Sequence, residues 1–196
     1  PEASILNPNF PIAVMHRTAI VFYCVQAIFN ALSKALPEAV MAPSGTYPLW
    51  VERFAGRFDD GRPFVSSFNA QGGQGARFDQ DGIATTVFPA NVASTSIELF
   101  EVETPVLCER KVLITDSGGP GRQRGGLGQE VVLRNLATAD ALVSMSGGRF
   151  HVAAPGMDGG GEGTLGEICM DGGPPEQRRR QGLLPHERAV SFKYPG

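Results

Sequence analysis

A glycine-rich stretch just past the middle of the chain constrains the fold more than any other part of the sequence. Residues 116–128 contain six glycines and one proline among thirteen residues, and strand-like runs flank them on both sides. Glycine is the residue that tolerates a positive φ or the very close approach of another group. A cluster of glycines between two strands therefore predicts a loop of fixed shape rather than a slack linker.

Two arginines give this loop its binding potential. The guanidinium groups of Arg122 and Arg124 can bind a carboxylate, a phosphate or backbone carbonyls. A Walker phosphate-binding loop is excluded, because no lysine follows the glycines and the next residues, 131–133, favour a strand over a helix. The residues alone favour a structural turn held by arginines, since a conspicuous loop only tends to carry function.

Hydrophobic patterning predicts one long helix near the N-terminus. It begins between Pro11 and Thr18 and runs to about Leu36, where Pro37 stops it. Its polar residues form one narrow stripe and nearly everything else is apolar. We therefore expect a helix that is buried almost all round, either by the rest of the chain or by a partner surface.

Eight strand candidates follow this helix, and most are joined as meanders. Residues 59–61 are a strong hairpin signal, and Thr95 with Glu98 is a capping-box pattern for a short helix before Pro105. The strand-like runs are 49–58, 63–70, 83–88, 106–115, 130–135, 141–146, 164–170 and 188–194. The pattern predicts an α+β fold of mostly antiparallel β-structure, a sandwich or barrel-like sheet packed against the helix.

Composition excludes several functional classes. The chain has 196 residues, enough for one domain with its own core. A net charge of −3 predicts no nucleic-acid partner, and no apolar run is long enough to predict a membrane span. The three cysteines, Cys24, Cys108 and Cys169, are widely spaced, so neither a disulfide framework nor a zinc site is indicated, and we expect a cytoplasmic protein.

Recognisable catalytic motifs are missing. Residues 161–166 formally match a dinucleotide-binding fingerprint, but they neither follow a strand nor open a helix. The histidines, His16, His151 and His186, lack metal-ligand spacing, and no Gly-x-Ser-x-Gly elbow occurs. The sequence therefore predicts no metal site and assigns no catalytic residue.

Amide side chains and a second glycine loop form the most suggestive chemical cluster. Amides and exposed backbone N–H groups can bind an amide or carboxylate ligand without net charge, and they are equally suited to holding a turn. The cluster consists of Asn69, Gln71, the glycines of residues 72–75, Arg77 and Asn91.

The glycine-rich stretch also resembles a family hallmark. From Ser117 it runs Ser-Gly-Gly-Pro-Gly-Arg-Gln-Arg-Gly-Gly-Leu-Gly, similar to the Ser-Gly-Gly-x-Gly-x-x-Arg-Gly-Gly-x-Gly of the hydantoinase B/oxoprolinase family. Other pieces fit the same family in the same order: Leu6-Asn-Pro8, Ala35-Leu-Pro37, Pro43-Ser-Gly-Thr46, the loop from Gln71 to Arg77, and Asp81-Gly82. The resemblance spans residues 5–194 and is far more specific than any single piece.

The resemblance implies a place in a larger machine. Residues 1–196 would be a single C-terminal domain, or a fragment, of a hydantoinase B-type subunit that continues for several hundred residues at its N-terminus. Such subunits act with an ATP-binding hydantoinase A-type subunit, which is thought to phosphorylate a carbonyl oxygen of a small-molecule substrate. We expect ATP and a divalent metal elsewhere in the complex and no cofactor on this segment, because the family's metal-associated residues lie in the N-terminal portion.

The implied activity is ATP-dependent opening of a cyclic amide such as hydantoin or 5-oxoproline. A related alternative is a subunit of an acetone or acetophenone carboxylase, and a non-catalytic scaffold or interface module is compatible with either. Residues 91–95 lack an arginine present in many members, which leaves the substrate open, and we expect the isolated chain to be inactive. The residues expected to bind substrate or shape its site are Asn69, Gln71, Gly72, Gly73, Arg77, Asn91, Ser117, Arg122 and Arg124.

Overall fold

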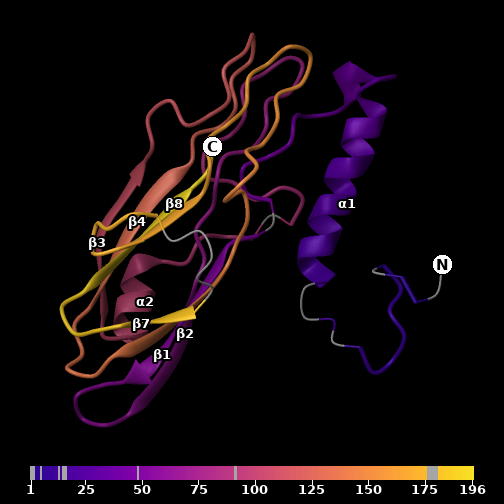
Figure 1. The fold of residues 1–196 in the computed structure, drawn as a ribbon. Helices are drawn as coiled ribbons and strands as arrows, with labels where there is room; N and C mark the ends of the chain where they lie inside the picture. Colours follow the sequence, from indigo (N-terminus) through magenta and orange to yellow (C-terminus); the bar gives the residue numbers. More distant parts are fainter. Residues whose placement is uncertain are drawn as a thin grey trace.

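Two four-stranded antiparallel sheets form the body of the protein. The computed structural model describes residues 3, 4, 6–12, 14, 17–47, 49–90, 92–175 and 181–196 (Figure 1). One sheet has the order β2-β1-β5-β7 and the other β3-β4-β8-β6. The predicted α+β, mostly antiparallel class is confirmed, and of the two predicted forms the described strands make a sandwich and not a closed barrel. The strands are β1 Val51–Arg57, β2 Pro63–Phe68, β3 Val106–Leu113, β4 Gln129–Asn135, β5 Ala141–Ser146, β6 Glu167–Met170, β7 Gln181–Leu184 and β8 Ala189–Tyr194.

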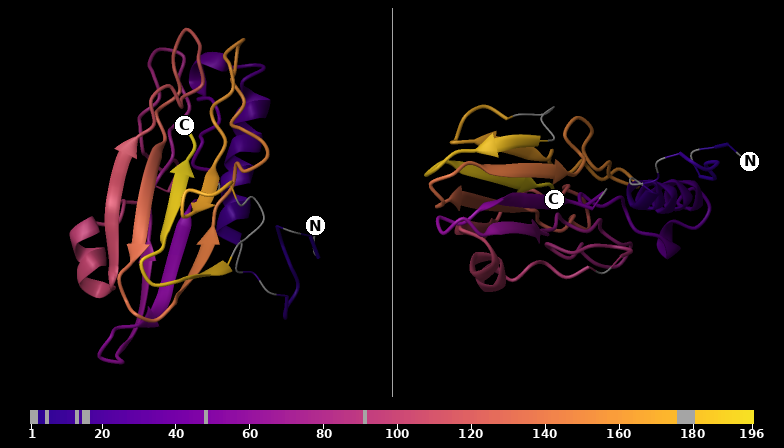
Figure 2. Two further views of the ribbon diagram at one scale, coloured as in Figure 1. Left: turned by 60° about the vertical axis from the view of Figure 1, so that its left-hand side comes forward. Right: turned by 90° about the horizontal axis from the view of Figure 1, so that it is seen from below.

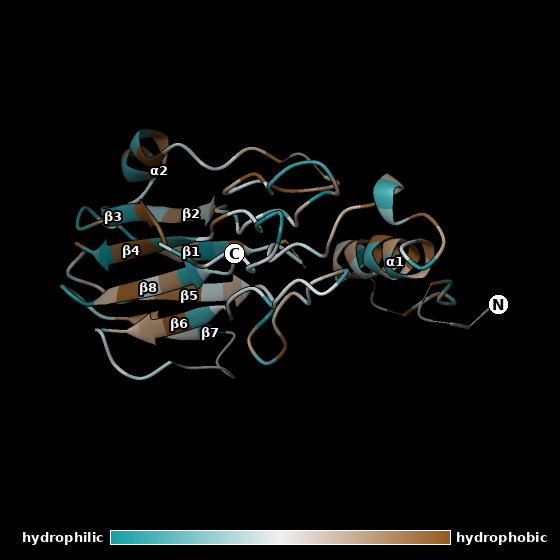
Figure 3. Ribbon diagram, turned by 90° about the horizontal axis from the view of Figure 1, so that it is seen from above, coloured by the Kyte–Doolittle hydropathy of each residue, from teal (hydrophilic) through white to brown (hydrophobic). Residues whose placement is uncertain are grey.

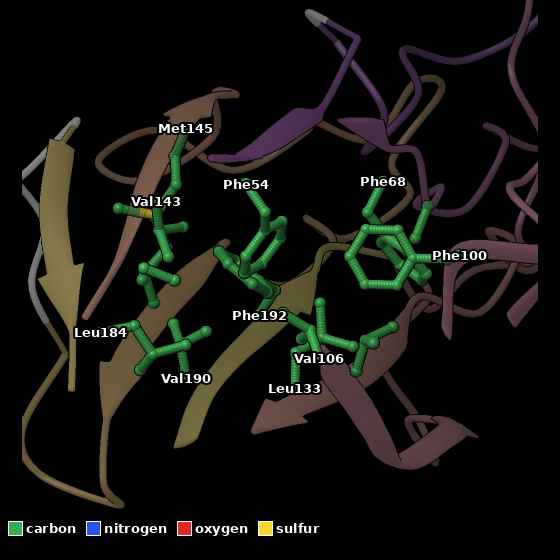
Figure 4. Packing of buried hydrophobic residues seen from close by; sticks show 14 of the residues in the cluster. Phe54, Phe68, Phe100, Val106, Leu133, Val143, Met145, Leu184, Val190 and Phe192 are labelled. Carbon is green, nitrogen blue, oxygen red and sulfur yellow. The ribbon is translucent and has the colours of Figure 1, made fainter. Parts of the chain in front are cut away.

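Alternation along the strands builds the core between the sheets. In β4 every second side chain is buried, which places Val131 and Leu133 against Phe192 of the neighbouring β8. Helix α2 (Ile97–Glu103) contributes Phe100, whose ring packs edge-on against Phe54 at 5.4 Å and against Phe68 at 5.1 Å (Figure 4). Burial of these aromatic rings provides the main stabilisation of the sandwich.

The expected hairpin joins β1 and β2, and the expected short helix is present with a different cap. Gly61 has a φ of 86° in the hairpin turn, where Phe58 N donates to Arg62 O at 2.9 Å. The N-cap of α2 is Ser96, whose Oγ accepts from Leu99 N at 3.3 Å, and not Thr95 as predicted. Thr95 instead accepts from Asn69 N, a contact between distant segments that local spacing does not reveal.

One predicted strand is absent and one observed strand was missed. Residues 83–88 form turns rather than a strand, because Thr85 has a φ of 48°, which an extended strand does not allow. Their backbone nevertheless bonds to both glycine loops, since Thr86 N donates to Gly72 O and Thr85 N to Leu127 O. Strand β7 was not predicted, because four residues are too few for a clear alternation pattern.

The N-terminal helix is shorter and more exposed than the sequence predicts. Helix α1 covers Arg17–Leu32, 16 residues, and a turn follows before the 3-10 helix η1 (Pro37–Ala39). It stands beside the loops at one end of the sandwich and packs on neither sheet (Figures 2 and 3). No described helix is long and apolar enough to cross a membrane.

The expectation that the rest of this chain buries α1 was therefore wrong, and cover by a partner surface stays a prediction. Among its side chains whose exposure is described, only Phe22 is buried, packed edge-on against Tyr47 at 5.4 Å. Val21 and Ile28 remain 56% and 55% exposed. The physical reason is that the inward faces of the two sheets pack against each other and against Phe100 of α2, so this core is filled without any residue of α1.

Candidate functional site

The two glycine loops meet at one end of the sandwich. Residues 71–75 follow β2, and residues 116–128 connect β3 to β4. Gly126 N donates to Gln74 O at 2.8 Å, and Gly73 N donates to Pro195 O at 2.8 Å. A Cβ added to Gly73 would lie 1.9 Å from the carbonyl oxygen of Gly126. The loops have the fixed shape that the sequence predicts, and we call this contact the glycine junction.

Ser117 closes the base of the hallmark loop. It is buried, and its Oγ donates to Ile114 O at 2.8 Å while accepting from Gly128 N at 2.8 Å. One hydroxyl therefore holds together the two ends of a loop of about a dozen residues. These contacts give Ser117 a role in shaping the loop.

Replacing Ser117 with alanine is expected to lower the free energy of unfolding by about 1–3 kcal/mol, because the buried N–H of Gly128 would lose its acceptor. Urea unfolding measures the change. Ser66→Ala is a matched control, since Ser66 Oγ donates to Glu103 at the surface, and its loss should be within about 0.5 kcal/mol. Equal losses in the two variants would contradict a structural role for Ser117.

Of the predicted amide residues that the structure describes, Gln71 is buried and Asn69 is half-buried. Gln71 is buried, and its backbone oxygen accepts from Gln129 Nε2 at 2.8 Å, while its side-chain amide finds no hydrogen-bond partner among the described residues. Asn69 anchors Thr95 through its backbone N–H. Gly72 contributes its carbonyl to Thr86 N. These three residues shape the loops from within, and Asn91 lies outside the described residues.

A cavity of about 300 Å³ opens beside the glycine junction. Its walls come from residues 37, 40, 42–43, 74–78, 119–123, 125, 154–161 and 163, with Gly196 at one side. Of the predicted site residues, Arg77 and Arg122 line it, whereas Asn69, Gln71, Gly72, Gly73, Ser117 and Arg124 do not. The volume is at the lower end of those that hold small-molecule ligands.

The three predicted arginines have different surroundings. Arg124 is held by Asp116, with Nη2 2.7 Å from Oδ1, and its backbone N–H donates to Asp81. Arg77 lies 3.7 Å from Asp79. Arg122 stacks over the ring of Phe78, 5.7 Å from its centroid, and pairs with no carboxylate in the described part of the chain. Arg122 is therefore the arginine of the cavity whose charge is left for a ligand.

Two buried charged residues were missed by the sequence reasoning. The first, Arg149, donates to Gln26 of α1 at 2.7 Å and to Ser44 O, and burial lowers its pKa while the neighbouring Tyr23 and Tyr47 raise it. It fastens α1 to the loops of the sandwich. No local signal marks Arg149 as this anchor, because Gln26 and Ser44 lie more than a hundred residues away along the chain.

The second, Glu52, is fully buried in β1 between the two sheets. Burial raises its pKa to about 8, against a smaller lowering by the hydroxyl of Tyr194 on the opposite sheet. The two groups face each other without the geometry of a full hydrogen bond. The alternation of Trp50, Glu52 and Phe54 was a signal that could have placed this carboxyl inside.

The described residues offer few side chains for metal binding or redox chemistry. No group of three or more His, Cys, Asp or Glu side chains could hold a metal ion among the described residues. The three cysteines are free. The cavity wall offers Arg77, Arg122, the carboxylate of Asp158, the amides of Gln74 and Gln123, and backbone groups.

The fold and site define a class: an antiparallel β-sandwich domain that shapes a small polar cavity with glycine-rich loops. Comparison with known families then identifies it. The model of the hydantoinase B/oxoprolinase family matches residues 1–194, and the chain belongs to this family. The resemblance seen in the hallmark loop is confirmed.

Similar proteins come from the same family. A protein named as the B component of a D-/L-hydantoinase from Pseudomonas sp. (strain NS671) is 28% identical over 194 residues, covering 97% of this chain and 32% of that protein. The beta chain of the caprolactamase of Pseudomonas jessenii is 46% identical over 56 residues, covering 29% of this chain and 10% of that protein. The chain thus spans about a third of the length of the first of these relatives.

Two solved structures share the fold. The ATP-dependent caprolactamase from Pseudomonas jessenii has a TM-score of 0.69 and 27% identity, covering 85% of this chain and 31% of that one. A nucleotide-free acetone carboxylase has a TM-score of 0.65 and 16% identity, covering 84% and 27%. At that identity the second likeness shows the fold alone.

Proposed function

We propose that this chain is part of an ATP-dependent hydrolase that opens cyclic amides of the hydantoin, 5-oxoproline or lactam type. The observation that carries the proposal is the 46% identity with one chain of a caprolactamase over 56 residues, together with the caprolactamase fold at 27% identity. The alternative is a subunit of an ATP-dependent ketone carboxylase, which the likeness to acetone carboxylase supports only through the fold.

The chemistry of such a reaction explains why ATP would be needed. A ring amide is a poor electrophile, because its nitrogen donates electron density to the carbonyl. Transfer of the terminal phosphoryl group of ATP to the carbonyl oxygen would leave ADP and make the carbon electrophilic. Water would then add to this carbon, the ring C–N bond would break as the nitrogen takes a proton, and hydrolysis would release phosphate as the carboxylate forms. We propose that ATP and a divalent metal are bound by an A-type partner and by other parts of the B-type subunit, while this chain supplies a rigid scaffold and the cavity.

The exposed apolar face of α1 supports a place inside a larger assembly. Val21 and Ile28 are more than half exposed, and Leu32 is 41% exposed, which leaves apolar surface uncovered on one side of the helix. The hydantoinase relative is about three times as long as this chain. We propose that the rest of the B-type subunit covers this face, in a complex with the A-type partner in the cytoplasm.

Substrate-dependent release of phosphate tests the proposal. The complete B-type subunit that carries this chain would be combined with its A-type partner and offered hydantoin, 5-oxoproline and caprolactam, or acetone and acetophenone with bicarbonate. We expect release with a cyclic amide and none with the ketones. This chain alone should release no phosphate, because the proposal places ATP on the A-type partner and on other parts of the B-type subunit. Release only with ketone and bicarbonate would replace the proposal with the carboxylase alternative.

A further inference from the structure

The net charge of the cavity wall determines which ligand charge the cavity can balance. Three charged side chains line it, Arg77, Arg122 and Asp158, so the lining side chains carry one net positive charge. Asp79 approaches Arg77 and offsets part of its charge. A ligand with a single negative charge would balance this wall, whereas a doubly charged phosphate would be repelled by the carboxylate of Asp158.

Arg122 is prepared to hold such an anion. Its guanidinium lies over the ring of Phe78, and its N–H donors bond to no other described residue, so they can form a bidentate contact with a ligand. The backbone N–H groups of Gly121, Arg122 and Gln123 donate to no other group within the described ranges. Successive free N–H groups in a glycine-rich turn are suited to an anion.

The cavity wall also carries hydrogen-bond acceptors, in addition to the N–H donors of Arg122 and its loop. Asp158 can accept a hydrogen bond from a ligand N–H, and the amides of Gln74 and Gln123 can donate or accept. Phe78 and Met157 provide apolar wall between these polar groups. A ligand would therefore carry a carboxylate at one end, an N–H donor at the other and a short apolar link between them.

We propose that this cavity binds a small monoanionic amide, in which a carboxylate contacts Arg122 and an N–H group faces Asp158. The ligand class deepens the proposed function and rests on it, because 5-oxoproline and the ring-opened acids of hydantoins carry this pair of groups. The cavity would then hold a substrate carboxylate or retain the acid product.

Isothermal titration calorimetry of the purified protein, without ATP or an A-type partner, tests the inference. The probes are 5-oxoproline, neutral caprolactam and inorganic phosphate. We expect 5-oxoproline to bind more tightly than the other two. Arg122→Gln should weaken 5-oxoproline binding by about tenfold or more, as expected for losing a hydrogen bond between charged groups.

Arg124→Gln is the matched control. Arg124 lies two residues away on the same loop, is paired with Asp116 and does not line the cavity, so 5-oxoproline affinity should stay unchanged. Asp158→Asn should increase the affinity for phosphate, because it removes the repelling carboxylate. Tighter binding of phosphate than of 5-oxoproline by the unmodified protein, or equal effects of the two arginine variants, would overturn the inference.

The outcome is separable from that of the proposed function. If the complex turned over ketones only, the proposed hydrolase would fail, yet Arg122-dependent binding of 5-oxoproline would still establish the cavity as a monoanion site. If the complex opened cyclic amides while 5-oxoproline failed to bind here, the hydrolase would stand and this cavity would not be its ligand site.

Discussion

Gly73→Ala is expected to destabilise the protein by roughly 3–5 kcal/mol, a size reached only by severe steric or packing defects. The added Cβ would lie 1.9 Å from Gly126 O and 2.5 Å from Gly126 C, and both atoms belong to backbone that cannot rotate away. Movement of the loop would also strain the hydrogen bonds from Gly73 N to Pro195 O and from Gly45 N to Gly73 O. Urea unfolding followed by circular dichroism measures the loss.

Gly61→Ala is the control that separates the effect of steric crowding on stability from the effect of a positive φ. Gly61 sits in the β1–β2 hairpin with a φ of 86°, and an added Cβ would meet nothing within 4 Å. The expected loss is only about 1–2 kcal/mol, the usual penalty for a non-glycine residue in the left-handed region. If Gly73→Ala were no worse than Gly61→Ala, the glycine junction would not be the rigid contact described above.

The hallmark loop shows which part of the site a sequence can predict. Glycine spacing between two strands predicted a loop of fixed shape, because only close approach or positive φ explains so many glycines. It did not predict what approaches, since Gly73, Gly126 and Pro195 are separated by more than fifty residues along the chain. The same limit applies to Arg122 and Arg124, which are alike in sequence and differ only because Asp81 and Asp116 fold next to Arg124.

Helix α1 and Glu52 show how packing overrides local pattern in opposite directions. The apolar pattern of α1 predicted that the helix is buried. Such a pattern indicates that the helix surface will be covered, but it does not indicate whether this chain or another covers it. A glutamate is ordinarily exposed because of its charge, yet strand alternation directs Glu52 inward with Phe54. In both cases the local residues determine the chemistry of the side chains, and the packing of the two sheets decides their exposure.

Glu52→Gln is expected to remove a large pH dependence of stability. The pKa of this carboxyl rises from its ordinary 4.5 to about 8 because burial disfavours the charged form. Between these two pH values the folded protein keeps a proton that the unfolded chain has released. Raising the pH through this window therefore lowers the free energy of unfolding by up to about 1.4 kcal/mol per pH unit, and the loss is complete above the folded pKa.

The variant lacks this titration, so the two proteins should diverge as the pH rises. Near pH 5 both side chains are neutral in the folded state, and their unfolding free energies should be similar. At pH 9 the wild-type carboxylate would be charged in the core beside Tyr194, whose own pKa is raised by burial, and Glu52→Gln should be the more stable protein by several kcal/mol. Urea unfolding at pH 5, 6, 7, 8 and 9 would measure both curves.

Glu38→Gln provides the control, because Glu38 lies exposed in η1 and its variant should follow the wild type at every pH. Parallel curves for wild type and Glu52→Gln would show that water or a structural change already solvates the carboxyl, which would contradict the full burial of Glu52 between the sheets. Divergence of the predicted sign would instead show that a proton is held inside the sandwich at neutral pH. The domain would then need its two sheets closely packed to keep that proton. The glycine junction at the end of the sheets would depend on the same packing through Tyr194, because the backbone oxygen of Tyr194 would lie 2.0 Å from a Cβ added at Gly128.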